Sequence, residues 1–445
     1  MATPGTRRPR GKVFYGWWIV AAGGSVQWYV AAVFWRGFPA FFDSMVGTFG
    51  WSHAATAGPA SIQRIQGGMI SPFVGTVLDK FGPRKAMTFG VAVTGLGFMF
   101  MSQVNSLWQF YLSVALLTLG MSFGTFIVLV ATVNNWFIRK RGQALSIMMA
   151  ASALGGFTFP LLVFSIDHFG WRSVLFAVGV GCWIIGFPAA YMMKRSPEEY
   201  GLLPDGGPPP AVSADGKTQQ AGIPRETNIR VKEAIKLRFF WQLALATSIG
   251  QMVSATNLVH LTALKEFGVS AGLAAAAVGS IAFGDLAGRL LSGVLGDRFD
   301  KRKLLAMAFA VEMIGTVGLT LVNYEVGPFK FSPAWTLPVF IVGFGLGFGA
   351  TVPLRLAMMG DYFGRKSYGS IVGLMSSVSA GFGAAGPVFA GLMFDLTGDY
   401  RPAFAIMAAL LVLAVPMSLA LESQHRVAAL ARLKFKASRL ARTRK

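Results

Sequence analysis

Six ionisable side chains lie inside long apolar runs of the sequence, where a charge is costly and marks an ion or substrate pathway. Four are arginines and two are acids: Arg36, Arg64, Asp285, Arg289, Glu312 and Arg355. The positive charges exceed the negative ones by two, and an anionic substrate would neutralise that excess in a loaded site. The sequence therefore predicts a pathway for anions, with all four arginines as candidate substrate-binding residues.

Asp285 and Arg289 are four residues apart, so a helix places them on one face, one turn apart. While Asp285 is ionised, it occupies the Arg289 guanidinium. Protonation of Asp285 would free that guanidinium to bind a carboxylate through a two-point contact. The spacing predicts a proton-coupled switch at this pair, and a purely structural ion pair is the alternative.

Arg36 lies in the aromatic stretch WYVAAVFWRGFPAFF. We expect it near the outer mouth of the pathway, unless its side chain only extends toward the lipid head groups. Arg355 precedes Asp361 by six residues, so these two side chains could instead pair at a membrane interface. Arg64 is a third candidate for the wall of the pathway.

Three uncharged or acidic side chains in the apolar runs are further candidates. Tyr29 and Asn134 could line the pathway and bind substrate, although helix packing would explain them equally well. Glu312 is a candidate for proton coupling, with a hydrogen-bonded structural acid as the alternative.

Other chemistry finds little support in the residue types. Cys182 is the single cysteine and the four histidines are scattered, which argues against a disulfide framework or a metal centre. GFGLGFG at 343–349 resembles a dinucleotide-binding pattern, but it falls inside an apolar run, where small residues let helices approach closely. With neither a Walker-type loop nor a nucleophile and its base, we expect no cofactor, no direct use of ATP and no enzymatic activity.

The elements that position these residues are long apolar helices. The chain has 445 residues, of which 54% are apolar and only 13% charged, about half the charged share of a soluble protein. Each of the apolar runs is long enough for a helix to cross hydrocarbon, which takes about 20 residues. The runs are 16–41, 54–78, 86–104, 108–136, 142–166, 171–193, 240–264, 271–296, 303–322, 335–360, 367–393 and 402–421. Runs this continuous predict transmembrane helices and exclude the alternating strands of a barrel.

The basic residues predict the orientation of the chain. The net charge is +21, yet with both termini in the cytoplasm only Arg172, Lys265, Lys330 and Arg401 fall in outer loops. We therefore expect a multi-pass protein of the plasma membrane, or of the inner membrane if the source is bacterial. The N-terminal apolar run is too long for a cleaved signal peptide. The basic tail is expected near anionic lipid rather than on nucleic acid.

A Pro/Gly/Ser-type linker divides the chain into two halves. The predicted parts are a cytoplasmic N-terminal tail, a six-helix bundle, a cytoplasmic linker, a second six-helix bundle and a basic cytoplasmic tail: 1–13, 14–193, 194–239, 240–421 and 422–445. Segments of the first half recur in the second at offsets between 218 and 228 residues, among them GTVLDKFGPRK with GVLGDRFDKRK and WFIRKRGQ with YFGRKSYG. Such a repeat predicts two related bundles.

The sequence resembles the major facilitator superfamily over its whole length. The resemblance rests on the loop Gly75-x-x-x-Asp79-Lys80-x-Gly82-x-Arg84-Lys85. Within the superfamily the chain looks most like the monocarboxylate transporters and their bacterial relatives, including oxalate/formate antiporters. The matching pieces are FGWS at 49–52, SPFVGTVLDKFGPRK at 71–85, NWFIRKRGQAL at 135–145 and MMGDYFGRKSYGSIVG at 358–373, with Asp285-x-x-x-Arg289.

The resemblance implies an all-α membrane protein of twelve helices with a cytoplasmic gate of ion pairs that stabilises the outward-facing state. The gate residues here are Gly75, Asp79, Arg84, Lys85, Asp297, Lys301 and Arg302. An aspartate beside an opposing helix N-terminus gains from the helix dipole. The positive-inside rule alone would explain the basic residues, but not the repeated glycine and aspartate.

The resemblance also implies that Asp285 and Arg289 take part in substrate and proton coupling. Arg36 stands where monocarboxylate transporters carry a lysine that is linked to proton binding and to substrate binding. An arginine does not release a proton under working conditions, so Arg36 could hold an anion but could not relay a proton. We expect alternating-access transport of a small organic anion, most simply a monocarboxylate, with a proton, by a functional monomer. The alternatives are a dicarboxylate/monocarboxylate exchanger, a proton-driven efflux pump and, from another class, a transporter-like sensor. Oxalate/formate antiporters carry a lysine in the helix that corresponds to 367–393. This sequence has no charged residue between Lys366 and Asp395, which argues against the dicarboxylate substrate.

Overall fold

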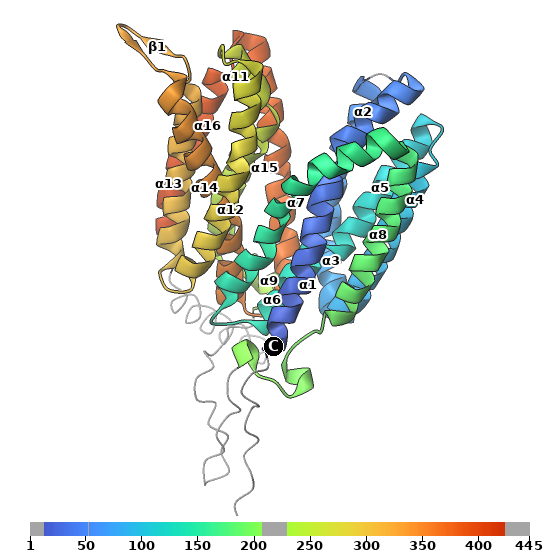
Figure 1. The fold of residues 1–445 in the computed structure, drawn as a ribbon. Coiled ribbons are helices and arrows are strands. Elements are labelled where there is room, and N and C mark those ends of the chain that lie inside the picture. The colour runs from blue at the N-terminus through green and yellow to red at the C-terminus, as the bar shows by residue number, and fades with distance from the viewer. Residues whose placement is uncertain (1–12, 52, 207–228, 423–445) are drawn as a thin grey trace, which may run out of the picture.

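The computed structural model describes residues 13–51, 53–206 and 229–422, without the side chains of Pro39, Asp43, 53–65 and Phe157. Figure 1 shows two bundles of helices that converge at one end and diverge toward the other. We call the end where α8 finishes and α9 begins the linker end. The opposite end carries the small β1–β2 hairpin and is called the hairpin end (Figure 1).

The first bundle, which we call the N half, contains the elements from α1 to α8. They are α1 (Tyr15–Val30), the π-helix η1 (Ala31–Trp35), α2 (Phe38–Phe49), α3 (His53–Phe81), α4 (Pro83–Ser102), α5 (Leu107–Gly124), α6 (Phe126–Trp136), α7 (Arg141–Phe169) and α8 (Trp171–Met192).

The linker contributes three short elements, and the second bundle, the C half, follows. The short elements are η2 (Glu198–Tyr200), η3 (Pro204–Gly206) and α9 (Val231–Ala234). The C half consists of α10 (Arg238–Ala255), η4 (Thr256–Leu258), α11 (His260–Glu266), α12 (Ala271–Gly296), α13 (Lys301–Thr320), β1 (Glu325–Val326), β2 (Phe329–Lys330), α14 (Pro333–Phe363), α15 (Tyr368–Thr397) and α16 (Arg401–Leu419). Strands β1 and β2 pair antiparallel.

Among the described residues, nine helical segments are long and apolar enough to cross a membrane, and ten if α7, bent by 41° near its middle, counts as one span. The two remaining predicted runs, 54–78 and 240–264, fall on α3 and on α10 to α11. The domain boundaries stay a prediction.

Several local features depart from the sequence prediction, among them η4, which interrupts the run 240–264. The first run is interrupted by η1, where the Arg36 amide donates to the carbonyl of Ala31, a π-type bond of 3.0 Å. The run 108–136 divides at Thr125 into α5 and α6. The hairpin was not predicted; its turn is made by Gly327, whose φ of 57° suits glycine.

The glycines of α14 let this helix pack against two neighbours at very short range. An added Cβ on Gly343 or Gly347 would collide with α13, at Gly315 and Glu312, respectively. On the other face, an added Cβ on Gly345 or Gly349 would collide with the α12 backbone around Asp285. The interpretation of GFGLGFG as a helix-packing stripe is thus confirmed, and the stripe holds α12, α13 and α14 together.

Candidate functional site

Asp285 and Arg289 form a buried ion pair on α12. The Arg289 Nε donates to the Asp285 Oδ1 at 2.7 Å, and the two residues are only 9% and 8% exposed, respectively. The predicted one-turn geometry is therefore present. The α14 glycines press against the α12 backbone at Asp285, which fixes this turn of the helix.

The far end of the Arg289 guanidinium points across to the N half. Its Nη1 lies 3.4 Å from the carbonyl oxygen of Met149 on α7, a long hydrogen bond. Its Cζ lies 5.9 Å from the ring centroid of Phe348. Its Nη2 makes no hydrogen bond to any described residue. Arg289 is thus a charged group with one edge engaged by Asp285 and its Nη1/Nη2 edge largely available.

Arg355 lies on α14 and is 8% exposed. Its Nη1 lies 3.5 Å from the hydroxyl oxygen of Ser379 on α15, which in turn lies 3.2 Å from the hydroxyl oxygen of Ser248 on α10. Its Nε is buried and has no partner among the described residues. Asp361 pairs instead with Arg141 and Lys301, so the alternative Arg355–Asp361 pair is not formed.

The remaining predicted arginines lie elsewhere. Arg36 ends the π-helix η1, is exposed, and lies with its guanidinium over Gly156 of α7: an added Cβ there would be 3.2 Å from the Arg36 Cζ. Arg64 belongs to α3, but its side chain falls outside the described residues.

Tyr29 and Glu312 are engaged within their own halves. The Tyr29 hydroxyl donates to the Val178 carbonyl at 2.7 Å. Glu312 is fully buried, accepts from the Ser254 hydroxyl at 2.8 Å and keeps its Oε2 without a partner among the described residues. Their predicted roles stay predictions, and neither residue enters the site proposed below.

Asn134, on α6, is fully buried where the two halves meet. Neither atom of its amide has a hydrogen-bond partner among the described residues. An added Cβ on Gly360 of α14 would collide with the Asn134 amide oxygen. Asn134 is therefore covered by the C half in this state, which leaves its predicted substrate contact untested.

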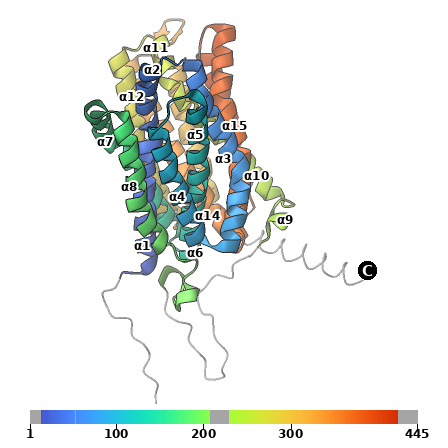
Figure 2. The same cartoon turned by 90° about the vertical axis from the view of Figure 1, so that its right-hand side faces the viewer.

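The halves touch along two seams. The first seam joins α3 to α15, which lie side by side in Figure 2. At its linker end the Asp79 carboxylate accepts from the amide and hydroxyl of Ser370, at 3.2 and 2.6 Å, in the first turn of α15. Farther along, an added Cβ on Gly75 would collide with the Gly369 backbone, and one on Gly373 with the Ser71 backbone.

The second seam joins α7 to α12. The Asp297 carboxylate accepts from the amides of Gly142 and Gln143, at 2.8 and 2.9 Å, in the first turn of α7. Nearby, Asp361 accepts charge-assisted bonds from Arg141 at 2.7 Å and Lys301 at 2.9 Å. Both seams thus place an aspartate on the N-terminus of a helix in the other half, which the helix dipole favours.

The other predicted gate residues take partners that the sequence did not specify. Arg302 pairs with Asp300 at 2.6 Å, and the Arg84 guanidinium lies 4.2 Å from the Tyr191 ring centroid. Lys85 is exposed in the first turn of α4.

Two neighbouring acids in the α12–α13 connection, at the linker end, have pKa values shifted in opposite directions. Burial raises the pKa of Asp297, while the hydrogen bonds from Gln143 and Gly142 oppose that shift. The Arg302 side chain lowers the pKa of Asp300 by donating to its carboxylate. Sequence reasoning missed Ser370, Arg141 and Asp361 as seam residues, although they lie in the repeated segments WFIRKRGQ and YFGRKSYG or beside them.

A family comparison identifies the class of this protein. The model of the Major Facilitator Superfamily matches residues 27–324 and 243–442. The chain belongs to this superfamily, so it is a multi-pass membrane transporter of small molecules and not an enzyme. The predicted fold is confirmed.

Individual relatives place the chain near the monocarboxylate transporters, as predicted. It is 26% identical to monocarboxylate transporter 13 of Bos taurus over 89% of this chain and 87% of the relative. It is 24% identical to human monocarboxylate transporter 2, over 90% and 84% of the two chains.

Solved structures show the same fold at low identity. The human organic anion transporter MFSD10 matches with a TM-score of 0.66 and 14% identity, over 91% of this chain and 99% of that one. The E. coli fucose:proton symporter matches with a TM-score of 0.64 and 14% identity, over 92% of this chain and 100% of that one.

Proposed function

We propose that this transporter carries a small monocarboxylate together with a proton by alternating access around Arg289. The observation that supports the proposal most is the Arg289 guanidinium: it is buried, its Nε is held by Asp285, and its Nη2 has no partner among the described residues. A carboxylate on the Nη1/Nη2 edge would complete a two-point contact. The names of the curated relatives support the same substrate class.

The proposed cycle begins in the state described above, with the linker end closed. A proton adds to an oxygen of Asp285, which releases the Arg289 Nε and leaves the guanidinium with an uncompensated charge. The substrate carboxylate then neutralises it. Binding on the Nη1/Nη2 edge competes with the Met149 carbonyl, so loading weakens a contact between the halves. The halves can then rock to open the linker end.

Two other arginines have supporting roles in this proposal. Arg36, exposed toward the hairpin end, attracts anions to the site. Arg355 adds positive potential from α14 without a carboxylate of its own. The linker end faces the cytoplasm of a plasma or inner membrane, in line with the distribution of basic residues, and one chain suffices for transport.

Uptake by proteoliposomes tests the proposal. Purified protein would be given radiolabelled lactate, pyruvate or acetate, with and without an inward proton gradient. Accumulation above equilibrium with the gradient is expected for at least one acid. Asp285→Asn should lose gradient-driven accumulation but keep exchange of labelled for unlabelled substrate, because it holds no transferable proton.

Arg289→Lys should lower uptake at least tenfold, since lysine offers a point charge and not a planar two-point contact. Arg298→Lys, an exposed change on the loop after the same helix, is the matched control and should leave uptake unchanged. Gradient-driven accumulation that survives in Asp285→Asn would refute the coupling step. Full uptake by Arg289→Lys would refute the proposed two-point contact between Arg289 and the substrate carboxylate.

The unpartnered Nε of Arg355 favours a second candidate, exchange of a dicarboxylate for a monocarboxylate. A second buried cation could take the second carboxylate. Counterflow separates the two functions: an exchanger moves labelled oxalate or succinate only against internal substrate and ignores the proton gradient, whereas the proposed symporter accumulates the monoacid alone.

A further inference from the structure

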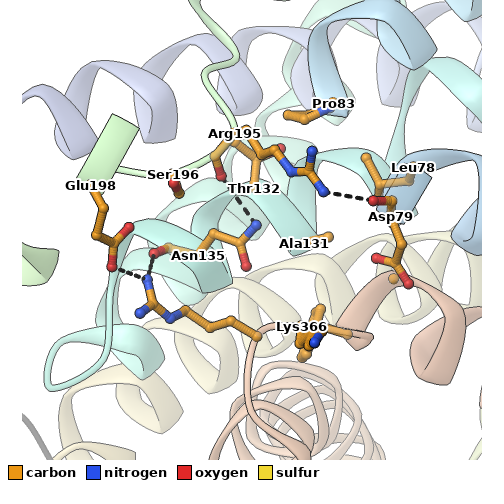
Figure 3. Close-up of a pocket in the computed structure, with 13 residues that line it drawn as sticks. Leu78, Asp79, Pro83, Ala131, Thr132, Asn135, Arg195, Ser196, Glu198 and Lys366 are labelled. Atoms are coloured by element: carbon orange, nitrogen blue, oxygen red, sulfur yellow. Dashed lines mark hydrogen bonds and ion pairs between the residues drawn. The ribbon is translucent and has the colours of Figure 1, made fainter. Parts of the chain in front are cut away.

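A cavity of about 390 Å³ lies at the linker end, beside the first seam, and Arg289 is not among its lining residues. Its walls come from three parts of the chain. The N half supplies the end of α3 and part of α6, the linker supplies 195–198, and the C half supplies the α14–α15 connection. Figure 3 shows the side chains that converge on it, among them Asp79, Arg195, Glu198 and Lys366.

The polar lining has a basic excess. Three bases, Arg195, Arg365 and Lys366, face two acids, Asp79 and Glu198. Both acids are already engaged: Asp79 accepts from Ser370, and Glu198 pairs with Arg365 at 2.8 Å. The Arg195 guanidinium donates to a neutral acceptor, the Asp79 backbone carbonyl, at 2.7 Å. Its charge is therefore not matched by a hydrogen-bonded carboxylate, and an anion in the cavity would meet it.

The linker segment is fixed in place by bonds that leave this wall well defined. The Asp205 carboxylate accepts from the amides of Ile138, Arg139 and Lys140 at 2.8 to 3.1 Å. The Asn135 side-chain amide donates to the Arg195 carbonyl at 3.1 Å, and Arg365 donates to the Asn135 carbonyl at 2.9 Å (Figure 3). The cavity is thus a built feature with a positioned arginine.

The cavity exists only while the linker end is closed. Asp79 and Gly369 line it from opposite sides of the first seam, so separation of α3 from α15 would take its walls apart. A ligand that binds one state and not the other shifts the population toward the state it binds. An occupant here would hold the hairpin end open.

We propose that this cavity is an allosteric site for a phosphate-bearing anion, taken either from a lipid head group or from a soluble phosphate. Two arginines and a lysine from the linker and the C half converge on it, and guanidinium groups bind phosphate through paired bonds. Basic pockets at the cytoplasmic ends of membrane helices are suited to phosphorylated head groups. The site is separate from the proposed transport site.

The test measures conformation in the full-length protein without transported substrate. Spin labels at Phe169 and Gly272, on the hairpin-end parts of α7 and α12, report the separation of the halves. The protein is placed in phosphatidylcholine nanodiscs, with phosphatidic acid added to the bilayer in one arm and inorganic pyrophosphate added to the solution in the other. We expect at least one arm to increase the population with the long distance. The arm that responds identifies the source of the phosphate.

Arg195→Gln with Lys366→Gln should abolish that increase, whereas Arg298→Gln with Lys303→Gln, which removes the same charge from exposed linker-end positions, should preserve it. Lys366→Gln alone is the milder variant if the double variant does not purify as a monodisperse protein. If both double variants lose the response equally, the response comes from general charge attraction and the proposal is overturned. The absence of a response in both arms would also overturn it. Loss of the response in Arg289→Ala would place the phosphate in the transport site and also overturn it.

Discussion

The two seams are built on one frame but filled differently. On α3 the positions at four-residue intervals are Gly67, Ser71, Gly75 and Asp79; the equivalent positions on α12 are Asp285, Arg289, Gly293 and Asp297. The aspartate at the linker end does the same in both seams, because each accepts bonds from the first turn of a helix in the other half. The difference lies two and three turns deeper.

At that depth the first seam holds only Ser71 and Gly67, and the Ser71 backbone faces Gly373; one turn nearer the linker end, Gly75 faces the Gly369 backbone. The second seam holds the Asp285–Arg289 pair, and a guanidinium reaches the Met149 carbonyl. In the proposed mechanism, closing the linker end is a property of both repeats, whereas the chemistry of the substrate belongs to one. Substitutions in the two seams and a pH titration test this division.

The largest effect is expected where backbones meet. Gly75→Ala should prevent closure of the linker end and abolish uptake, because the new Cβ would collide with the Gly369 backbone, which has no side chain to move. The closest atoms to a Cβ added at Gly293 are those of the Ser146 side chain, at 2.5 Å, with the Gly142 carbonyl oxygen at 3.0 Å, so Ser146→Gly in the same protein should restore most of the uptake of Gly293→Ala. Proteoliposome uptake measures both. A tolerated Gly75→Ala would break the contrast.

Arg289→Ala should lower uptake by about 100-fold, because removing one partner of a buried hydrogen-bonded charge costs about 2–5 kcal/mol. Ser71→Ala, at the equivalent position of the first seam, should leave uptake within about twofold, the range of a neutral site. The measurement is the initial rate at subsaturating substrate. Similar losses in the two variants would mean that both seams carry substrate chemistry.

The two aspartate caps should have equal, intermediate effects. Asp79→Asn and Asp297→Asn each replace an acceptor oxygen by an NH2 group, which cannot accept from the first turn of the opposing helix, and such a cap bond is worth about 1 kcal/mol. Each variant should therefore lower the ratio of closed to open linker ends by about fivefold, as measured by spin-label distances. A much larger effect at one position would show that the seams are not equivalent as gates.

The smallest effect is a pH dependence of closure. Burial raises the pKa of Asp297 in the closed seam, where Lys301 and Asp361 also face it, and opening returns the carboxyl to solvent. The closed state therefore binds the proton more tightly, so a fall from about pH 7 to about pH 5, toward the titration range of carboxyls, should favour closure. That gain is lost as the pH rises through the raised pKa. Asp297→Asn should weaken the dependence; an unchanged profile would assign it to another group.

The fold could be predicted from the sequence because the length of the apolar runs and the repetition of segments between the two halves are visible without a structure. Apolar runs of spanning length predicted the helices, and the Gly75 and Asp79 frame, repeated at Gly293 and Asp297, predicted which loops would lie at the seams. The Asp285–Arg289 geometry followed from helical periodicity alone, since both residues lie on one helix.

Contacts between distant parts of the chain could not be predicted in this way. The Arg141–Asp361 pair and the Asp205 contacts with residues 138–140 depend on how the halves and the linker dock. The engagement of Tyr29 with Val178 depends on which face of α1 packs against α8, and the apolar sequence around it has no polar face to reveal this. The π-helix η1 itself contains neither proline nor glycine; Gly37 and Pro39 come after it, where α2 begins, so they announce the start of α2 and not the π-type turn.

The position of both charges on one rigid helix has an electrical consequence. In the empty carrier, ionised Asp285 and Arg289 sum to zero; in the loaded carrier of the proposed cycle, protonated Asp285, Arg289 and the substrate carboxylate also sum to zero. An unbalanced charge that crossed the membrane would couple to the voltage by about 2.3 kcal/mol per 100 mV. Because α12 and any bound substrate together carry no net charge at this point in either form, reorientation should be electroneutral, and a clamped membrane potential should leave the transport rate unchanged.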